Sequence, residues 1–316
     1  MKVLVMCPGT IAPTKEKINC YSQVLNYYIP RALSNIVDCD TIAFPNEKDL
    51  EGCKNAFENL NLDSYDAIIT TGLRFYSKIP NQYFQILRNK FEGPICQTYD
   101  GSRGLADPVD ITFTSKNNIT PQHSHKNVSM GWAADHELNY PNQSLTDLRI
   151  LIDHTNYGGN KIDSTVDIIK QVKKFVDSNL WKKKWNSVSV RRFCNGKIVD
   201  VDFNDLNIET YNKTVIPITE ISKEHCEAHV FIVTHPESLG LVALETALAG
   251  AYVVCQKNYI SQDRLNTIRS YTHEGKINWQ YVLDNINPKE SRKKALENTW
   301  ENVAKRIVNE LKKRIK

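Results

Sequence analysis

The sequence lacks the marks of several classes of protein. No stretch approaches the about 20 consecutive apolar residues that a membrane-spanning helix needs. The opening residues, MKVLVMCPGT, contain an apolar run too short for a secretory signal. The eight cysteines include no Cys-x-x-Cys pair, which argues against a zinc knuckle or a disulfide framework. We therefore expect a cytoplasmic protein with reduced thiols and no transmembrane segment.

No internal repeat or low-complexity segment interrupts the chain. Its 316 residues suit two domains of about 150 residues each. Hydrophobic residues make up 41% of the chain, which is enough for sizeable cores. The net charge of +4 is below what a dedicated nucleic-acid-binding protein usually carries. Basic residues gather in four places, interpreted mostly as solvated helix faces: residues 173–174, 182–184, 191–192 and 292–316.

Short apolar runs alternate with helical patterns along the chain. We expect strands at residues 2–7, 40–44, 66–72, 95–99, 110–114, 150–153, 187–193, 214–218, 231–233 and 252–255. We expect helices at 17–35, 81–90, 164–178, 223–228 and 240–249, with one or two more in the tail. This alternation is typical of doubly wound parallel sheets. The polar, turn-rich stretch 141–147 indicates a linker, so we predict domains at 1–144 and 145–290 and a helical segment at 291–316.

Residues 231–255 form the most informative stretch. A short apolar strand leads into a helix rich in Leu and Ala, a capping Gly250 and a second apolar strand. Glu237 precedes the helix, where exposed backbone N–H groups attract anions, so it serves either a ligand or only the helix dipole. Glu245 lies on the apolar stripe of the helix and needs a polar partner there. A ligand hydroxyl, a lysine or a backbone group would each satisfy it, and the spacing does not choose between them.

This stretch, PESLGLVALETALAGAYVV, resembles the donor-site signature of retaining nucleotide-sugar glycosyltransferases of the GT-B fold, in which two glutamates are separated by seven residues. The positions in register are Glu237, Gly240, Leu241, Glu245, Gly250, Val253 and Val254, whereas Thr246 and Tyr252 replace the more usual Ala and Pro. Residues 127–141 resemble the segment that closes the N-terminal domain in that family. The tail resembles its last element, and its Trp300 is expected to pack in a core rather than stack on a ligand.

The resemblance implies an α/β protein of the GT-B class. It would have two facing Rossmann-like, doubly wound parallel-sheet domains, an acceptor side at 1–144 and a donor side at 145–290, with a C-terminal helix crossing back onto the first. The donor would be a nucleotide-diphosphate sugar, such as a UDP- or GDP-sugar, with no cofactor. By position, Glu245 would hold the ribose hydroxyls and Glu237 the transferred sugar. The diphosphate would meet the N–H groups near Leu239, Gly240, Leu241 and Val242. Because no Asp-x-Asp-like metal site accompanies this motif, we expect transfer without a metal.

The sequence departs from the family at the basic pair that grips the diphosphate. The loop after the strand 150–153 normally carries an Arg and then a Lys. Lys161 can serve as the Lys, although a surface lysine is nearly as good an interpretation. The loop contains no Arg, so His154 or Arg191 would have to substitute. Asp153 in the same place would repel a diphosphate.

Asp100 ends the strand 95–99, where retaining relatives often place a His facing the sugar. It could face the sugar, act as the general base of an inverting enzyme, or merely cap the following glycine-containing turn. Gly9, expected beside it, would let the acceptor or the diphosphate approach the backbone closely. We predict retention of the anomeric configuration, because the match at Glu237–Glu245 is longer than an argument from one aspartate.

The leading prediction is a hexosyl- or pentosyltransferase that acts on an unidentified acceptor. Duplex DNA is one such acceptor: phage and viral DNA-base glycosyltransferases are compact GT-B proteins, and this chain has basic clusters. A GT-B-shaped nucleotide-sugar epimerase would use the same site without an external acceptor. A non-catalytic nucleotide-sugar binder is favoured by the missing diphosphate arginine.

Overall fold

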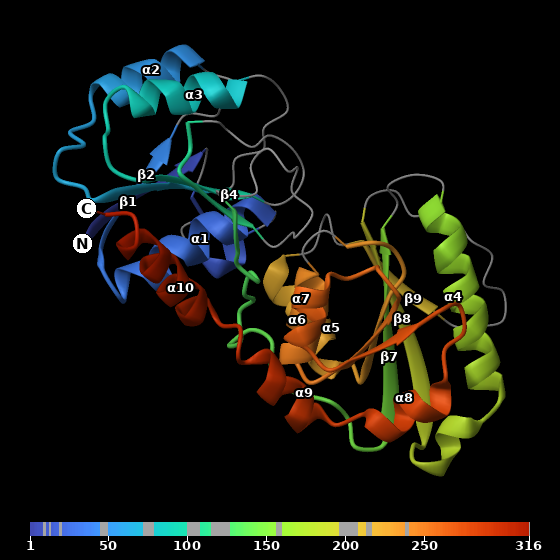
Figure 1. The fold of residues 1–316 in the computed structure, drawn as a ribbon. Coiled ribbons are helices and arrows are strands. Elements are labelled where there is room, and N and C mark those ends of the chain that lie inside the picture. The colour runs from blue at the N-terminus through green and yellow to red at the C-terminus, as the bar shows by residue number, and fades with distance from the viewer. Residues whose placement is uncertain are drawn as a thin grey trace. The chain divides into compact units, whose positions relative to one another are not determined.

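The chain folds into two compact units, the first made of residues 1–132 and 300–316 and the second of residues 133–299. The computed structural model describes residues 1–8, 11–12, 14–18, 21–44, 50–71, 79–99, 108–114, 127–155, 160–195, 208–212, 217–237 and 240–315. Figure 1 shows that each unit is a layered arrangement of a sheet and helices.

The first unit is built on a six-stranded sheet in the order β2-β1-β3-β4-β5-β6, with every neighbouring pair parallel. Its strands are β1 (Lys2–Pro8), β2 (Asp38–Phe44), β3 (Ala67–Thr70), β4 (Ile95–Tyr99), β5 (Ile111–Thr114) and β6 (Asn127–Ser129). Helices α2 (Leu50–Glu58) and α3 (Ile79–Arg88) cover one face, and α1 (Tyr21–Ser34) and α10 (Trp300–Lys312) cover the other (Figure 1). Alternate side chains of β1 supply both layers, because successive residues of a strand point to opposite faces. Leu4 packs in the core with Phe84 of α3, whereas Cys7 contacts the Asn26 carbonyl of α1.

The C-terminal helix α10 belongs to the first unit. Its buried residues Trp300, Val303 and Ile307 recur at helical spacing, as an amphipathic helix requires. The Trp300 ring stacks on the Tyr28 ring of α1, with centroids 5.2 Å apart and planes 2° from parallel. The core role predicted for Trp300 is therefore confirmed, and so is the return of the C-terminal helix to the N-terminal sheet.

The second unit repeats the architecture, with a parallel six-stranded sheet in the order β12-β11-β10-β7-β8-β9. Its strands are β7 (Asp147–Thr155), β8 (Ser187–Asn195), β9 (Ile208–Asn212), β10 (Val230–Val233), β11 (Tyr252–Gln256) and β12 (Ser270–His273). Its helices are α4 (Asn160–Asp177), α5 (Ile218–Glu227), α6 (Leu241–Leu248), α7 (Gln262–Asn266), α8 (Trp279–Asn285) and α9 (Pro288–Ala295). Residues 133–146 pack within this unit, where the Asn142 N–H donates to the Cys226 carbonyl at 2.8 Å.

Two hydrophobic layers sandwich the second sheet. On one face, Ile150 and Ile152 of β7 pack with residues of α4 and α8, including Phe175 and Leu283. On the other face, Leu151 packs with α6 and with Phe231 and Val253 of the neighbouring strands. The continuous apolar runs of the central strands follow from this burial on both faces. The predicted α/β class with two doubly wound parallel sheets is confirmed.

Several elements differ from those expected. Most of the strand predicted at 214–218 lies outside the described residues, but its last residue, Ile218, begins α5, and the strand β9 at Ile208–Asn212 was not predicted. Strands β6 and β12 and helices α2, α7 and α8 were not predicted. The three strands that were not predicted, β6, β9 and β12, each lie at the end of a sheet. An edge strand has one neighbour instead of two, so its sequence need not be a continuous apolar run.

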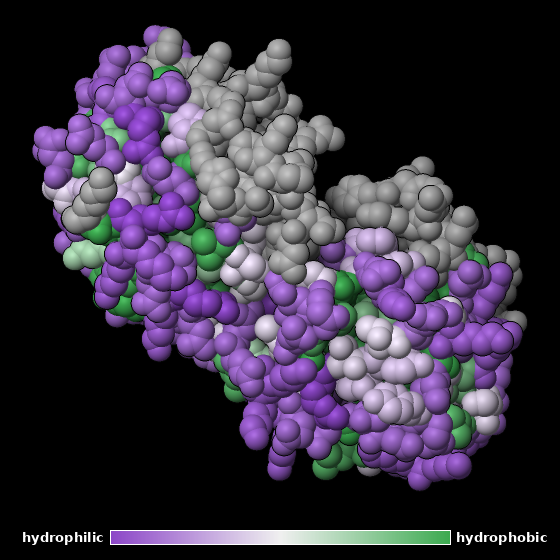
Figure 2. Space-filling view, in the orientation of Figure 1, coloured by the Kyte–Doolittle hydropathy of each residue, from purple (hydrophilic) through white to green (hydrophobic). Residues whose placement is uncertain are grey.

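Hydrophilic side chains cover most of the described surface in Figure 2, and hydrophobic ones are scattered over it. Among the described residues, the large hydrophobic side chains that are exposed include Ile36, Tyr140, Leu145 and Tyr281. No helix within the described ranges is both long enough and apolar enough to cross a membrane.

Candidate functional site

The order of the strands in the second sheet points to the place where a ligand binds. From β7 the chain moves outward through β8 and β9, then returns to β10 on the other side of β7 and continues to β11 and β12. The direction of winding therefore reverses between β7 and β10. In open parallel sheets, ligands bind at the carboxyl ends of the strands beside such a reversal. Here those ends carry Asp153 on β7 and residues 234–237 after β10.

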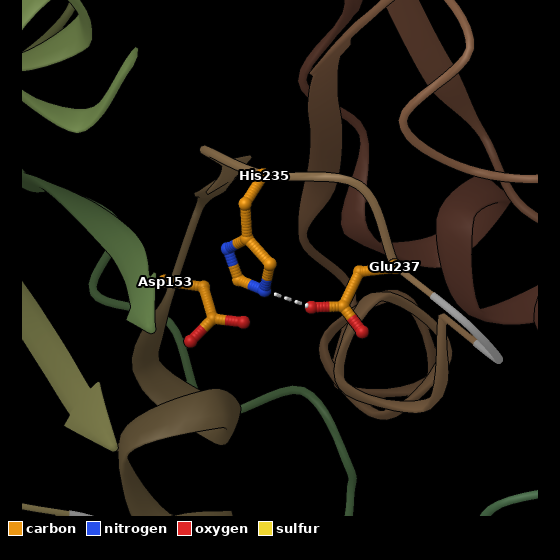
Figure 3. A group of neighbouring side chains, drawn as sticks. All are labelled: Asp153, His235 and Glu237. Carbon is orange, nitrogen blue, oxygen red and sulfur yellow. Dashed lines mark ion pairs between the residues drawn. The ribbon is translucent and has the colours of Figure 1, made fainter. Parts of the chain in front are cut away.

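Three titratable side chains meet at this reversal, namely Asp153, His235 and Glu237 (Figure 3). His235 Nε2 lies 2.6 Å from Glu237 Oε1, an ion-pair and hydrogen-bond distance. One ligand atom of each residue lies within 4.8 Å of those of the other two. Asp153 is 2% exposed and His235 is 4% exposed, whereas the Glu237 side chain keeps 21% of its area accessible. Glu237 is thus the member of this cluster that a ligand can reach.

The backbone around the cluster is held by specific hydrogen bonds. Val233, the last residue of β10, pairs with Asp153 across the sheet. The Thr234 hydroxyl donates to the Asp153 carbonyl and lies 3.4 Å from His235 Nδ1. The Glu237 N–H donates to the Tyr259 carbonyl at 2.7 Å. These bonds fix the loop after β10 to β7 and to the turn after β11, so the three side chains start from a rigid frame.

Gly240 shapes the start of α6. Its φ of +59° lies in the left-handed region, which favours glycine because it lacks a Cβ. A Cβ at this position would also lie 3.0 Å from Arg264 Cγ, since the buried Arg264 side chain passes beside Gly240. The helix then begins at Leu241 and the Gly240 carbonyl accepts from the Leu244 N–H. The first N–H groups of a helix have no acceptor within it, so those of Leu241 and Val242 are of the kind that bind anions.

Glu245 lies on α6, one turn from its start, with 14% of its side chain exposed. Its Oε2 is 3.7 Å from Nδ1 of His225 on α5, and that nitrogen is 3.2 Å from Asn139 Oδ1. A buried imidazole is thus a neighbour of this carboxylate, which the sequence did not predict. The hydroxyl of the next residue, Thr246, donates a hydrogen bond to the Val242 carbonyl of the same helix. This bond explains how a hydroxyl can replace the expected alanine in a buried position.

Arg191 forms ion pairs with two glutamates. Its guanidinium pairs with Glu224 of α5, and its Nε lies 3.0 Å from Glu209 of β9. In the register of β7 and β8, Arg191 is opposite Leu151, two residues before Asp153. It therefore lies further from the strand ends than the cluster does. Its role as a diphosphate cation stays a prediction that must compete with these two carboxylates.

Other predicted site residues are not placed by the structure. Gly9, Asp100 and Leu239 lie outside the described residues. Lys161 lies in the first turn of α4 and His154 near the end of β7, but their side chains are outside the described part as well. Their assigned roles stay predictions.

Two groups of neighbouring side chains were not predicted from the sequence. No role was predicted for His235, and Asp153 was expected only to repel a diphosphate, yet both share one cluster with Glu237. Asp153 and Thr234 are 81 residues apart in the chain, so no local spacing could reveal the contact. His225 had one usable signal: Ile221 lies four residues before it and Ala228 three residues after it, and a histidine with apolar residues at these spacings is often buried with a polar partner.

The fold and the position of the site define a class: the chain has the GT-B fold, which is shared by nucleotide-sugar glycosyltransferases and UDP-GlcNAc epimerases. No protein-family model and no curated protein sequence matches this chain. Solved structures do match along the full length. A sucrose-phosphate synthase from Thermosynechococcus elongatus superposes with a TM-score of 0.62 at 11% identity, covering 99% of both chains.

Two further structures have a similar degree of likeness. A UDP-GlcNAc 2-epimerase from Neisseria meningitidis, bound to UDP-GlcNAc, has a TM-score of 0.55 at 12% identity and covers 99% of this chain and 100% of its own. Anabaena Alr3699/HepE, in complex with UDP and glucose, has a TM-score of 0.55 at 9% identity and covers 99% of each chain. At such low identities the likeness establishes the fold and nothing finer.

Proposed function

We propose that this protein is a glycosyltransferase that takes a sugar from a nucleotide-diphosphate sugar and passes it to an acceptor. One observation carries the proposal: Glu237 and Glu245, whose spacing resembles the donor signature, flank the start of α6 beside the β7–β10 reversal. Glu237 is a carboxylate that the sugar can reach, and the N-terminus of α6 suits the diphosphate. Glu245, the second carboxylate, lies on α6 and suits the ribose. The UDP and UDP-GlcNAc complexes among the similar structures support a donor of this kind.

The roles follow from chemistry and position. Glu245 accepts hydrogen bonds from the two ribose hydroxyls, and His225 beside it keeps a polar neighbour next to the carboxylate when no ligand is bound. Glu237 accepts from a hydroxyl of the transferred sugar through Oε2, because Oε1 faces His235. The N–H groups of Leu241 and Val242 hold the diphosphate, where a helix dipole favours negative charge.

The transfer proceeds with retention in this proposal. The departing phosphate oxygen takes the proton of the acceptor hydroxyl on the face where the new bond forms, so no carboxylate base is needed. Asp100→Asn should then keep substantial activity with the anomeric configuration unchanged. An NMR spectrum of the anomeric proton of the product decides the point. An inverted anomer together with an inactive Asp100→Asn variant would assign Asp100 the role of general base, which contributes about 10²–10⁴-fold.

A thermal-shift panel tests the proposed function before any acceptor is known. A ligand that binds only the folded state raises the melting temperature, so one nucleoside diphosphate and its sugar should stand out from the others. Nucleoside monophosphates and free sugars serve as controls, because each lacks part of the proposed contacts. No shift with any nucleoside diphosphate or nucleotide sugar would contradict the proposal.

A nucleotide-sugar epimerase is the second candidate, because the Neisseria epimerase matches along its entire length. The two functions differ in what happens to the donor alone. An epimerase converts a nucleotide sugar into its epimer without an acceptor, whereas a transferase leaves the donor unchanged or slowly hydrolyses it. Product analysis after incubation with the donor that gives the largest thermal shift therefore separates them.

A further inference from the structure

The cluster of Asp153, His235 and Glu237 carries more negative than positive charge. Its two carboxylates bring two negative charges, and the imidazole supplies at most one positive charge. Two of the three residues are nearly inaccessible, with 2% and 4% exposure. Carboxylate oxygens and imidazole nitrogens are groups that bind divalent cations, and the two acids give the cluster a charge that a cation complements.

The three side chains are also the right kind of ligand at a suitable separation. In Figure 3 the two carboxyl groups lie on either side of the His235 ring, and the dashed line marks the ion pair from Nε2 to Glu237. A metal ion lies about 2.0–2.2 Å from imidazole nitrogen and carboxylate oxygen, which separates two donors of one ion by roughly 3–4 Å. The observed donors lie within 4.8 Å of one another, so small side-chain rotations bring all three to one ion.

We propose that Asp153, His235 and Glu237 bind one divalent first-row transition-metal ion, of the Mn²⁺ or Zn²⁺ type. One imidazole nitrogen and two carboxylate oxygens suit these ions better than Mg²⁺, which prefers oxygen ligands alone. Three protein ligands leave at least one coordination position for water or for an oxygen of another ligand. The loop that carries His235 and Glu237 is held to β7 by the Thr234 hydroxyl and to the turn after β11 by the Glu237 N–H.

Binding of the metal ion does not require the nucleotide sugar. If the proposed function holds, the ion also helps to bind the diphosphate. That second step rests on the proposed function. The ion would lie at the β7–β10 reversal, in the region where the sequence lacks the arginine expected for a diphosphate. Asp153, which repels a bare diphosphate, would instead hold the cation that attracts it. The expectation that transfer needs no metal is thereby open to a direct test.

Cobalt(II) is the probe for the site itself, because it replaces Zn²⁺ and its absorption reports the ligand type. The full chain is stripped with a chelator and titrated with Co²⁺ without any nucleotide. We expect one equivalent to bind with weak d–d bands only, and Zn²⁺ to displace it. Thiolate ligands would add an intense near-ultraviolet band, which is the signature of binding at cysteines instead. That band, or the absence of saturable binding, overturns the proposal.

Three substitutions locate the ion. Asp153→Asn, His235→Gln and Glu237→Gln should each weaken Co²⁺ binding by about 10²-fold, since each removes a direct ligand. His136→Gln and Glu274→Gln remove the same side-chain types outside the cluster and should bind as tightly as the parent. If the buried Asp153→Asn does not fold, the partly exposed Glu237→Gln carries the test. Unchanged affinity in a folded cluster variant overturns the proposal.

The same variants test the second step separately. If the ion contacts the diphosphate, Mn²⁺ should tighten binding of the nucleoside diphosphate found in the thermal-shift panel by about tenfold, and Asp153→Asn should abolish that gain. Metal binding without this gain limits the ion to a role that does not involve the diphosphate. Failure of all nucleotides to bind, with Co²⁺ binding intact, contradicts the proposed function and leaves the metal site standing.

Discussion

A buried histidine packs against β7 at each end of β10, and the two rings differ in their hydrogen-bond partners. That difference separates a structural role from a role in ligand binding. At the amino end, His229 Nδ1 accepts from the Arg149 N–H at 3.0 Å and Nε2 donates to the Ser144 carbonyl at 2.8 Å. At the carboxyl end, His235 Nε2 instead meets the Glu237 carboxylate, with Asp153 close by. The His229 ring is therefore held by backbone groups, whereas the His235 ring lies beside carboxylates that can also bind a ligand.

The protonation of His229 explains why its end of the sheet is structural. Nδ1 accepts from a backbone N–H only while it carries no proton, so the neutral ring is the form that fits. Burial lowers the pKa of His229 to about 4, and the positive charge of Arg149 adds to that effect. A ring that stays neutral and fully hydrogen-bonded stabilises the sheet and takes no part in exchange with a ligand. The comparison predicts that substitutions at the amino end of β10 lower the stability of the fold, whereas substitutions at the carboxyl end alter ligand binding and turnover.

The largest effect is expected at His229. Its pKa in the folded state lies below the ordinary value of 6.5, so the unfolded chain binds the proton first as the pH falls. The stability due to the neutral ring is present above pH 6.5 and lost as the pH falls toward 4, by roughly 3 kcal/mol in full. Urea unfolding at several pH values should therefore show a shallower pH slope for His229→Gln than for the parent. Equal slopes would contradict the assignment.

At the other end, Glu237→Gln should lower turnover by about 10²-fold, because a misplaced sugar loses the orientation that the reaction needs. In chelator-containing buffer, the affinity for free nucleoside diphosphate should stay within twofold of the parent, since Glu237 contacts the sugar. Glu274→Gln, an exposed carboxylate paired with Lys257, is the control and should leave both quantities unchanged. Equal losses of nucleotide affinity and turnover would reassign Glu237 to the diphosphate.

Glu245→Ala should weaken nucleoside diphosphate binding by about 1.5–3 kcal/mol, the range for hydrogen bonds to a charged group. Stability should change by less than about 1 kcal/mol, because alanine has the higher helix propensity at this position of α6. Glu220→Ala removes an exposed acid of α5 and serves as the control in isothermal titration. If Glu245→Ala binds the nucleotide as tightly as the parent, the ribose assignment is wrong.

The smallest effect is expected at Gly250, which directly follows the C-cap of α6. Its φ is +99°, and a Cβ there would lie 2.9 Å from both Gln143 Nε2 and Pro288 Cβ. Gly250→Ala should therefore destabilise the fold by about 1–2 kcal/mol without changing nucleotide affinity. Gly275 is a matched control, since its φ is +106° but a Cβ there would meet nothing within 4 Å. A cost at Gly250 no larger than at Gly275 would remove the steric part of this explanation.

Much of the fold could be predicted because the central strands are buried on both faces. Runs such as VLVM at the start and FIV at 231–233 have no polar side chain, and only a sheet covered by helices explains several of them in one chain. The edge strands β9 and β12 contain IETYN and SYTH, which carry no such signal. Helices α7 and α8 are short, and tertiary packing rather than periodicity determines them.

The candidate site could be predicted only where its residues are close in sequence. Glu237, Gly240 and Glu245 share one strand–helix unit, so the order of residues along the chain is enough to reveal their spacing. The partners of the two acids come from elsewhere: His225 from α5 and Asp153 from β7. A sheet whose winding reverses brings together strands that are distant in the chain, and no local pattern encodes that contact.

The stacking of Trp300 on Tyr28 has a consequence for how the chain matures on the ribosome. The second unit occupies one continuous segment, residues 133–299, whereas the first needs residues from both ends of the chain. The second unit can therefore close as soon as it leaves the exit tunnel, while the α1 surface stays uncovered until α10 emerges. A fragment that stops before Trp300 would present that apolar surface to chaperones or to other fragments. The order in which the units are synthesised is thus the reverse of the order in which they are completed.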